Sequence, residues 1–375
     1  MSSLCQRPKL SPATIKTSSP ASAGKSCSAS LKRSKRKQSL PLLVAVRPLN
    51  LENEKERFFK CRGKYNPQFT YSNGVETDKV TRYGEPSTKY LEQAYKILEN
   101  ALKIFGSYSR WEKISGGEMM TSEEVRKSVR KYLQCEGLGY EVQASFINIT
   151  QQILSNASMS RVGGKPTINI KEGTTHRNWI SGMLNHEIGT HYLRAYNNRK
   201  QKWSSKKVRK KFGMLPANPT EEGLASLNTH IDREQPVLIK SALMYITVYL
   251  ASQMSFSQTY EYLKKYIDTP DARWSYLMRA KRGQTDTSQP GCFPKDQMYL
   301  PGILEILCRR KEIDFENLYR LGKVSLRDVD KLLDRAVYSG TRIPGFLLDR
   351  EQYLHNLERI MICNGLTDEE LSALF

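Results

Sequence analysis

The stretch from residue 184 to residue 194 reads Leu-Asn-His-Glu-Ile-Gly-Thr-His-Tyr-Leu-Arg and contains two histidines, His186 and His191. Glu187 follows the first histidine directly. Zinc in catalytic sites is usually held by three protein ligands and a water molecule, and imidazole nitrogens are common among those ligands. A glutamate beside a metal-binding histidine is placed to take a proton from that water. The stretch therefore predicts a metal centre with His186 and His191 as ligands and Glu187 as the catalytic base.

The spacing of the two histidines departs from the pattern of a regular α-helix. Five residues turn an α-helix by about 140° beyond a full circle, so His186 and His191 would point away from each other. A local π-helical turn accommodates one extra residue and removes the conflict, and Gly189 makes such widening easier. We therefore predict a π-helical segment between the histidines. The alternative is two unrelated histidines on opposite faces of an ordinary helix.

A third ligand is available downstream, where residues 219–225 read Pro-Thr-Glu-Glu-Gly-Leu-Ala. Thr220 is expected to be the N-cap of a helix, which places Glu221 and Glu222 in its first turn. The helix dipole favours carboxylates there whatever their function. A glutamate from a downstream helix is also the third ligand of His2Glu zinc peptidases. Spacing alone does not decide between Glu221 and Glu222.

The rest of the pattern predicts an α+β fold that is mostly helical, with a small sheet beside the helix that carries the histidines. Apolar residues at three- and four-residue spacing predict helices over residues 88–105 and 122–133, and the apolar run at 237–250 predicts a buried core helix. Short β-branched stretches at 142–150 and 166–170 predict strands. The strand at 166–170 either pairs with an extended substrate or is simply an edge strand.

The positive charge is concentrated in two blocks. The chain has 59 Lys and Arg against 38 Asp and Glu, a net charge of +21, and residues 1–40 and 192–211 each carry nine basic residues and no acidic one. The first block is rich in Ser, Lys and Pro, which predicts a disordered basic tail before a single domain over 41–375. Both blocks would attract any acidic polymer, protein or nucleic acid, so charge does not identify the partner.

Several classes of protein are excluded by composition. No stretch reaches the roughly 18 to 20 uncharged apolar residues that a membrane-spanning helix needs. The seven cysteines show no CxxC pair or regular spacing, which favours reduced thiols over a disulfide framework. The hydrophobic content of 39% is high enough to exclude a wholly disordered chain. We therefore predict a cytoplasmic protein that does not enter the membrane.

The histidine stretch at 186–194 and the Glu-Glu-Gly-Leu-Ala at 221–225 are followed by Arg-Gly at 282–283, Asp-Thr at 286–287 and Gly-Cys-Phe-Pro-Lys-Asp at 291–296. Together these stretches closely resemble the microtubule-associated tyrosine carboxypeptidase (MATCAP) family, over roughly residues 45–375.

The resemblance implies a zinc metallocarboxypeptidase that removes the C-terminal tyrosine of α-tubulin. It implies His186, His191 and Glu222 as the ligands of one zinc ion and Glu187 as the catalytic glutamate. It also implies the α-tubulin tail and the microtubule surface as partners, and hence a place on the cytoskeleton.

A carboxypeptidase must also bind the terminal carboxylate of its substrate, which requires a positioned arginine or lysine. Arg279, Lys281 and Arg282 are the candidates, and the alternative for them is a solvated basic loop. Two other functions stay open. One is a carboxypeptidase that removes glutamates from tubulin tails, and the other is a non-catalytic protein that binds microtubules or nucleic acid through its basic blocks.

Overall fold

The computed structural model describes residues 46–72, 84–139, 146–153, 155–162 and 164–375. Contacts divide the chain into two units, Met1–Ser39 and Leu40–Phe375, and every feature below belongs to the second unit. The predicted disordered tail lies outside the described residues. No helix among the described residues is long and apolar enough to cross a membrane.

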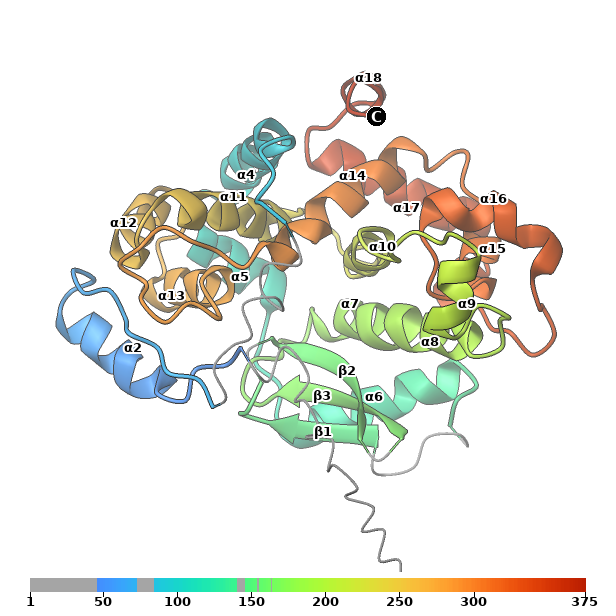
Figure 1. Cartoon of the computed structure of the whole chain (residues 1–375), viewed down its shortest axis with the longest axis horizontal. Helices are drawn as coiled ribbons and strands as arrows, with labels where there is room; N and C mark the ends of the chain where they lie inside the picture. Colours follow the sequence, from blue (N-terminus) through green and yellow to red (C-terminus); the bar gives the residue numbers. More distant parts are fainter. Residues whose placement is uncertain (1–45, 73–83, 140–145, 154, 163) are drawn as a thin grey trace, which may run out of the picture. The chain divides into compact units, whose positions relative to one another are not determined.

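The described residues are mostly helical, with one small sheet, as the sequence predicts (Figure 1). Before and within the sheet region the elements are α2 (Leu51–Lys60), α4 (Leu91–Phe105), α5 (Tyr108–Gly116), α6 (Ser122–Cys135), β1 (Ile147–Thr150), β2 (Ala157–Val162) and β3 (Lys165–Lys171). The central elements are α7 (Ile180–Leu184), η2 (Asn185–Tyr192), α8 (Leu193–Asn198), α9 (Lys206–Lys211), α10 (Thr220–Asn228), α11 (Ile239–Gln253), α12 (Phe256–Tyr262), η3 (Leu263–Lys265) and α13 (Pro270–Ala280). The chain ends with η4 (Pro294–Met298), α14 (Tyr299–Cys308), α15 (Phe315–Arg320), η5 (Leu326–Asp328), α16 (Val329–Leu332), η6 (Leu333–Arg335), η7 (Gly345–Leu347), α17 (Arg350–Cys363) and α18 (Asp368–Ser372).

The sheet has three strands in the order β1-β3-β2. Strand β3 runs parallel to β1, with Ile147 opposite Ile168, and antiparallel to β2, with Met159 opposite Ile168. Because β3 is paired on both sides, the predicted strand at 166–170 is neither an edge strand nor free to pair with a substrate. Both alternatives proposed for it are wrong, and the described edge nearest the histidine helix belongs to β2.

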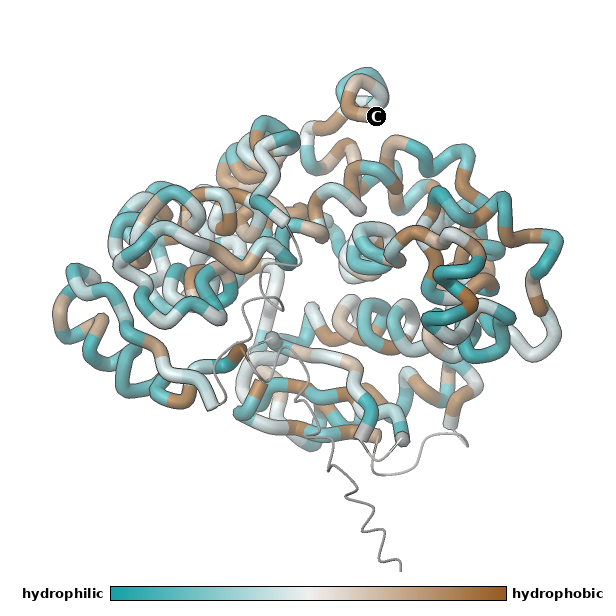
Figure 2. The backbone as a smooth tube through the Cα atoms, viewed as in Figure 1, coloured by the Kyte–Doolittle hydropathy of each residue, from teal (hydrophilic) through white to brown (hydrophobic). Residues whose placement is uncertain are grey.

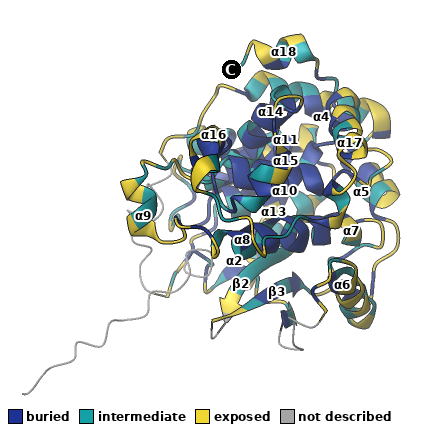
Figure 3. Cartoon of the chain, turned by 90° about the vertical axis from the view of Figure 1, so that its right-hand side faces the viewer, coloured by how far each residue is buried: buried dark blue, intermediate teal, exposed yellow. Residues whose placement is uncertain are grey.

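The described residues form two hydrophobic cores, and the smaller one contains the histidine helix. The smaller core joins the sheet and α6 to η2 through buried residues that include Val129, Ile168 and Ile188. The larger core is built around α11, the helix predicted at 237–250, in which most residues are buried (Figure 3). Hydrophobic residues recur among hydrophilic ones along the helices that cover it (Figure 2). The smaller core therefore packs the histidine helix against the sheet. The larger core is formed by the other helices.

A close contact between two glycines sets the position of α10. A Cβ atom on Gly223 would lie 2.2 Å from the main-chain carbon of Gly302 in α14, and one on Gly302 would lie 2.2 Å from the carbonyl oxygen of Pro219. Side chains cannot fit at either position, so α10 and α14 approach backbone to backbone. This contact fixes the first turn of α10, which carries both candidate glutamates.

The predicted helix boundaries lie close to the observed ones, while the predicted cap Thr220 is wrong. The helix predicted over 88–105 begins at Leu91, and the one predicted from Ser122 is capped by Thr121 in a capping box with Glu124. Thr220 is the first residue of α10, and its hydroxyl accepts the main-chain N–H of Leu326 instead of capping the helix. Of the strand predicted over 142–150, residues 142–145 lie outside the described residues.

Candidate metal centre

The histidine stretch lies in a π-helical segment, as its five-residue spacing predicts. Elements α7, η2 and α8 follow one another without a break, and the middle one is the π-helix Asn185–Tyr192. The hydroxyl of Thr190 donates to the carbonyl oxygen of Asn185, five residues earlier, at 2.8 Å. Residues five positions apart share a face in such a segment. The ring centroids of His186 and His191 consequently lie only 4.9 Å apart, with their planes at 79°.

Glu222 of α10 completes a set of three donors. One ligand atom from each of His186, His191 and Glu222 lies within 4.8 Å of the other two. Nε2 of His191, for example, lies 3.6 Å from a carboxylate oxygen of Glu222. Three donors at such separations can converge on one ion at the bond lengths of about 2.0 to 2.2 Å that zinc takes.

Gly189 is required by the packing around the π-helical segment. A Cβ atom at this position would lie 2.6 Å from the hydroxyl of Tyr132 in α6 and 2.7 Å from the ring of Phe346. Real Cβ atoms do not approach so closely, so a larger residue would push the segment away from both aromatic side chains. The glycine thus allows the histidine helix to lie directly against α6.

Each imidazole is oriented by a hydrogen bond at its Nδ1 atom. His186 Nδ1 lies 3.0 Å from the hydroxyl oxygen of Thr229, and that hydroxyl donates to the carbonyl of Ala225 at 2.9 Å. The Thr229 oxygen therefore accepts from Nδ1–H of His186. His191 Nδ1 lies 2.8 Å from a carboxylate oxygen of Glu221, which accepts in the same way. Both rings are left with the Nε2 lone pair available for a metal.

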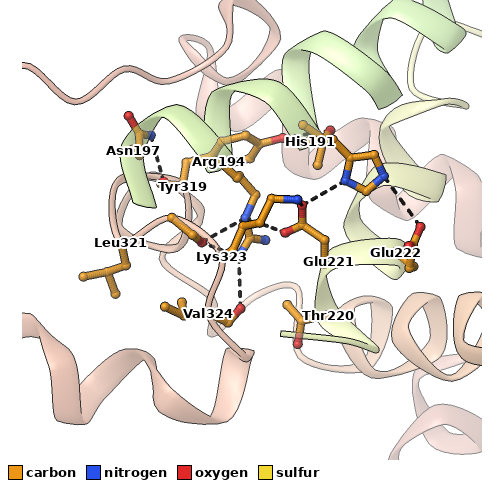
Figure 4. Close-up of polar contacts among 12 residues, drawn as sticks. His191, Arg194, Asn197, Thr220, Glu221, Glu222, Tyr319, Leu321, Lys323 and Val324 are labelled. Atoms are coloured by element: carbon orange, nitrogen blue, oxygen red, sulfur yellow. Dashed lines mark hydrogen bonds and ion pairs between the residues drawn. The ribbon is translucent and has the colours of Figure 1, made fainter. Parts of the chain in front are cut away.

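Glu221 lies at the centre of a buried ion-pair cluster (Figure 4). Besides His191, its carboxylate contacts Nε of Arg194 at 3.2 Å and Nζ of Lys323 at 2.8 Å. Arg194 is completely buried and also donates to the carbonyl oxygens of Gly322 and Val324. The structure thus gives the two adjacent glutamates different surroundings, because Glu221 faces cations and Glu222 faces the two histidines.

Glu187 is buried beside the three donors. The main-chain N–H of Met159 in β2 donates a hydrogen bond to its carboxylate, and its Oε2 atom has no hydrogen-bond partner among the described residues. Burial raises the pKa of Glu187 to about 7, with a contribution from Glu222, while His191 and Lys323 oppose the shift. A carboxylate with this pKa can both accept and release a proton near neutrality.

The electrostatics of the three donors follow from burial and from their proximity. Burial and the neighbouring His191 lower the pKa of His186 to about 3. Burial lowers the pKa of His191 as well, but the carboxylates of Glu221 and Glu222 outweigh it and raise that pKa to about 9. Burial alone would raise the pKa of Glu222, yet the hydrogen bond from His191 leaves it at about 2.

The residues present fit a zinc ion. The donor set of two imidazoles and one carboxylate is that of catalytic zinc sites. Each imidazole has the Nδ1 partner that fixes its ring in metal-binding proteins. Oε2 of Glu187 is buried beside them with no hydrogen-bond partner among the described residues, and a water molecule bound to the ion would be the kind of partner that a buried carboxylate oxygen needs.

The three cations predicted to bind a substrate carboxylate are engaged within the protein. Arg279 and Arg282 both pair with the buried Asp296, at 3.0 and 2.6 Å. Lys281 is fully buried and donates to three carbonyl oxygens, those of Ala251, Gln289 and Gly291. The alternative of a solvated loop is wrong for Lys281 and Arg282, because both are buried. Their contacts stabilise the loop that follows α13 and leave the proposed carboxylate contact without support.

Several residues that position the site were not predicted from sequence. The buried Asn228 donates to the hydroxyls of Thr190 and Tyr319 at 2.8 Å and accepts from the hydroxyl of Tyr353 at 2.8 Å. This network joins η2 and α10 to α15 and α17. The hydrogen-bonded pairs in this network are separated by 38 to 129 positions in the sequence, so no local pattern relates their members. For Thr229 the sequence contains one weak indication of a place near the site, because Thr229 follows Glu222 by two helical turns and so shares its face of the helix.

The described residues thus bring three possible metal donors together, two histidines from one helix and a glutamate from the first turn of a second. The model of the family described as microtubule-associated tyrosine carboxypeptidase matches residues 75–363, and the chain belongs to this family. The resemblance noted from the motifs is thereby confirmed.

The chain is also similar to individual members of the family. It is 46% identical over 337 residues to the putative tyrosine carboxypeptidase MATCAP2 of Mus musculus, and the match covers 90% of this chain and 64% of the mouse protein. It is 45% identical over 333 residues to microtubule-associated tyrosine carboxypeptidase 1 of Mus musculus, with 89% and 71% covered, and of Homo sapiens, with 89% and 70% covered. The chain thus spans less than two thirds of the first of these relatives.

Proposed function

We propose that this protein is a zinc-dependent metallocarboxypeptidase that removes the C-terminal tyrosine of α-tubulin. One observation carries the zinc-peptidase part: His186, His191 and Glu222 bring their ligand atoms within 4.8 Å of one another, with Glu187 buried beside them. The choice of substrate rests on the family, whose printed name is that of a tyrosine carboxypeptidase associated with microtubules.

The residues divide the reaction among themselves. His186, His191 and Glu222 would hold the zinc ion, which when bound polarises the scissile carbonyl and makes a water molecule acidic enough to attack it. Glu187 takes the proton of the attacking water at its free Oε2 and passes it to the departing amine. Glu221 and Thr229 keep the imidazoles turned toward the ion through their Nδ1 atoms.

The second basic block supports an acidic partner. Lys202, Lys206, Lys207, Lys210 and Lys211 are exposed on and before α9, whereas Arg194 from the same block is buried beside Glu221. The exposed lysines would attract the acidic surface of a microtubule and speed the encounter, and salt would weaken the effect. On this proposal the protein acts in the cytoplasm, on microtubules.

Mass spectrometry of tubulin tails tests the proposal. Tubulin is incubated with the purified full chain or with Glu187→Gln, and the zinc content of both proteins is measured. We expect stoichiometric zinc in both, and loss of the terminal tyrosine from α-tubulin only with the unsubstituted protein. Loss of glutamate instead would favour a deglutamylating carboxypeptidase. A protein without zinc that leaves every tail intact would favour a non-catalytic binding protein.

A further inference from the structure

Two half-buried cations, Arg233 and Lys240, lie together against a pair of tryptophans. Nζ of Lys240 is 4.0 Å from the ring of Trp179 and 5.5 Å from that of Trp111, and the guanidinium of Arg233 is 5.9 Å from the Trp179 ring. The two indole rings are stacked, with centroids 5.7 Å apart. Lys240 is the one charged residue of α11, the helix that forms the centre of the larger core.

The described part of the chain provides this cluster with no anion. Neither Arg233 nor Lys240 has a carboxylate within 4.0 Å among the described residues, and Glu112 affects Lys240 only at longer range. Nε of Arg233 and the indole N–H groups of both tryptophans are buried there without a hydrogen-bond partner. Burial, followed by the charge of Arg233, lowers the pKa of Lys240 to about 7. Two cations and several N–H donors are therefore gathered where one anion would satisfy them.

The cluster lies beside the metal residues. Trp179 is the N-cap of α7 and precedes His186 by seven positions, about two helical turns, so the two residues start from the same side of the helix. Burial and the charges of Arg233 and Lys240 hold the pKa of His230 well below its usual range, and His186 acts on the same ring. A Cβ on Gly182 would lie 2.1 Å from the carbonyl oxygen of Thr229, so α7 and the end of α10 touch between the two groups.

The separation between Trp179 and His186 along the chain suits the length of the end of a peptide. Seven helical residues rise by about 10 Å. The terminal carboxylate of a peptide lies about 4 Å beyond its last peptide bond, and contacts of about 3 Å at each end bring the span to a similar length. The end of a peptide whose last bond lies at the three donors is therefore long enough to extend toward Trp179, the residue that Lys240 and Arg233 contact.

We propose that Lys240, assisted by Arg233 and backed by Trp179 and Trp111, binds the C-terminal carboxylate of the peptide substrate. This assignment rests on the proposed function and replaces the cations of the 279–282 loop in that role. Lys240 and Arg233 thereby explain why the protein acts at a chain end, because an internal peptide bond offers no carboxylate at this distance.

Peptide binding tests the assignment without any turnover. In a Glu187→Gln background, affinity is measured by calorimetry for an acidic peptide that ends in tyrosine, either as the free acid or as the C-terminal amide. We expect the free acid to bind more tightly than the amide. Lys240→Met, which keeps the aliphatic stem, should weaken binding of the free acid by roughly ten- to a hundredfold and leave the amide unchanged.

The controls separate the possible failures. Lys265→Met removes a surface lysine that lies 4.5 Å from the ring of Tyr262, a similar cation–π contact, and should change neither affinity. Arg233→Gln should reduce the preference for the free acid and serves as the second variant where Lys240→Met does not fold. A preference that survives both substitutions, or equal losses for acid and amide, would overturn this inference alone. If the Glu187→Gln protein binds neither peptide, the proposed substrate class fails as well.

Discussion

Nδ1 of His191 lies 2.8 Å from a carboxylate oxygen of Glu221, on the side of the ring opposite the metal donors. The neighbouring Glu222 approaches the same ring at Nε2, at 3.6 Å. Two consecutive glutamates thus act on the two nitrogens of one imidazole. Glu222 lies among the three possible metal donors, while Glu221 contacts the opposite side of the ring and neutralises Arg194 and Lys323.

This relationship predicts different effects for the two glutamates on zinc affinity. Glu221→Gln should weaken zinc binding by about ten- to a hundredfold, which is typical when the partner of a metal-binding histidine is lost. Glu222→Gln removes a ligand and should weaken it much further. Affinity is measured by competition with a chelator, and the exposed Glu234→Gln serves as the control. Equal zinc affinity of Glu221→Gln and the unsubstituted protein would contradict the positioning role.

Gly189→Ala should disturb the π-helical segment. The new Cβ would overlap the Tyr132 hydroxyl and the Phe346 ring, and overpacking of this kind typically costs about 1–3 kcal/mol. We expect a lower free energy of unfolding in urea and weaker zinc binding, because the segment that moves carries both histidines. Gly139→Ala is the matched control, since its Cβ would meet only an ordinary contact at 3.4 Å. Unchanged zinc affinity in Gly189→Ala would show that the contact does not hold the histidines.

The site was predictable wherever its chemistry is local in sequence. The π-helical segment followed from the single fact that His186 and His191 are five residues apart, because a shared metal is incompatible with a regular helix at that spacing. Glu221 and Glu222 were indistinguishable because both occupy the first turn of α10, and only the packing of that helix against α14 and η2 separates them.

Long-range contacts were beyond the reach of sequence patterns. The basic run at 279–282 suggested exposed cations, but the buried Asp296 pairs with two of them after the chain has folded back. In the same way Lys240 interrupts an apolar helix in the sequence, and only the structure shows the tryptophans and Arg233 beside it. Strand β3 was predicted correctly as a strand, but its central place in the sheet depends on pairing with β1 and β2.

Asn228 should contribute strongly to stability through its buried network. Asn228→Leu leaves the hydroxyls of Thr190, Tyr319 and Tyr353 without their shared partner, and we expect a loss of about 3 kcal/mol. Tyr353→Phe removes a single hydrogen bond and should cost about 1 kcal/mol. Urea denaturation measures both values. Similar losses for the two variants would mean that Asn228 does not connect the network.

The ion pairs of Asp296 should make stability depend on pH in the acid range. Burial alone would raise the pKa of Asp296, but Arg282 and Arg279 lower it below its usual range. A carboxyl whose pKa is depressed by folding stabilises the protein above its unfolded-state pKa of about 4, and this contribution is lost as the pH falls through the folded-state pKa. The unsubstituted protein should therefore exceed Asp296→Asn in stability at pH 7 by about 3–5 kcal/mol, a difference that shrinks below about pH 4. Urea denaturation from pH 7 to pH 3 measures it, with the exposed Asp330→Asn as the control that should differ little at any pH. A difference that stays constant or grows in acid would show that Asp296 is not the charged partner of the two arginines.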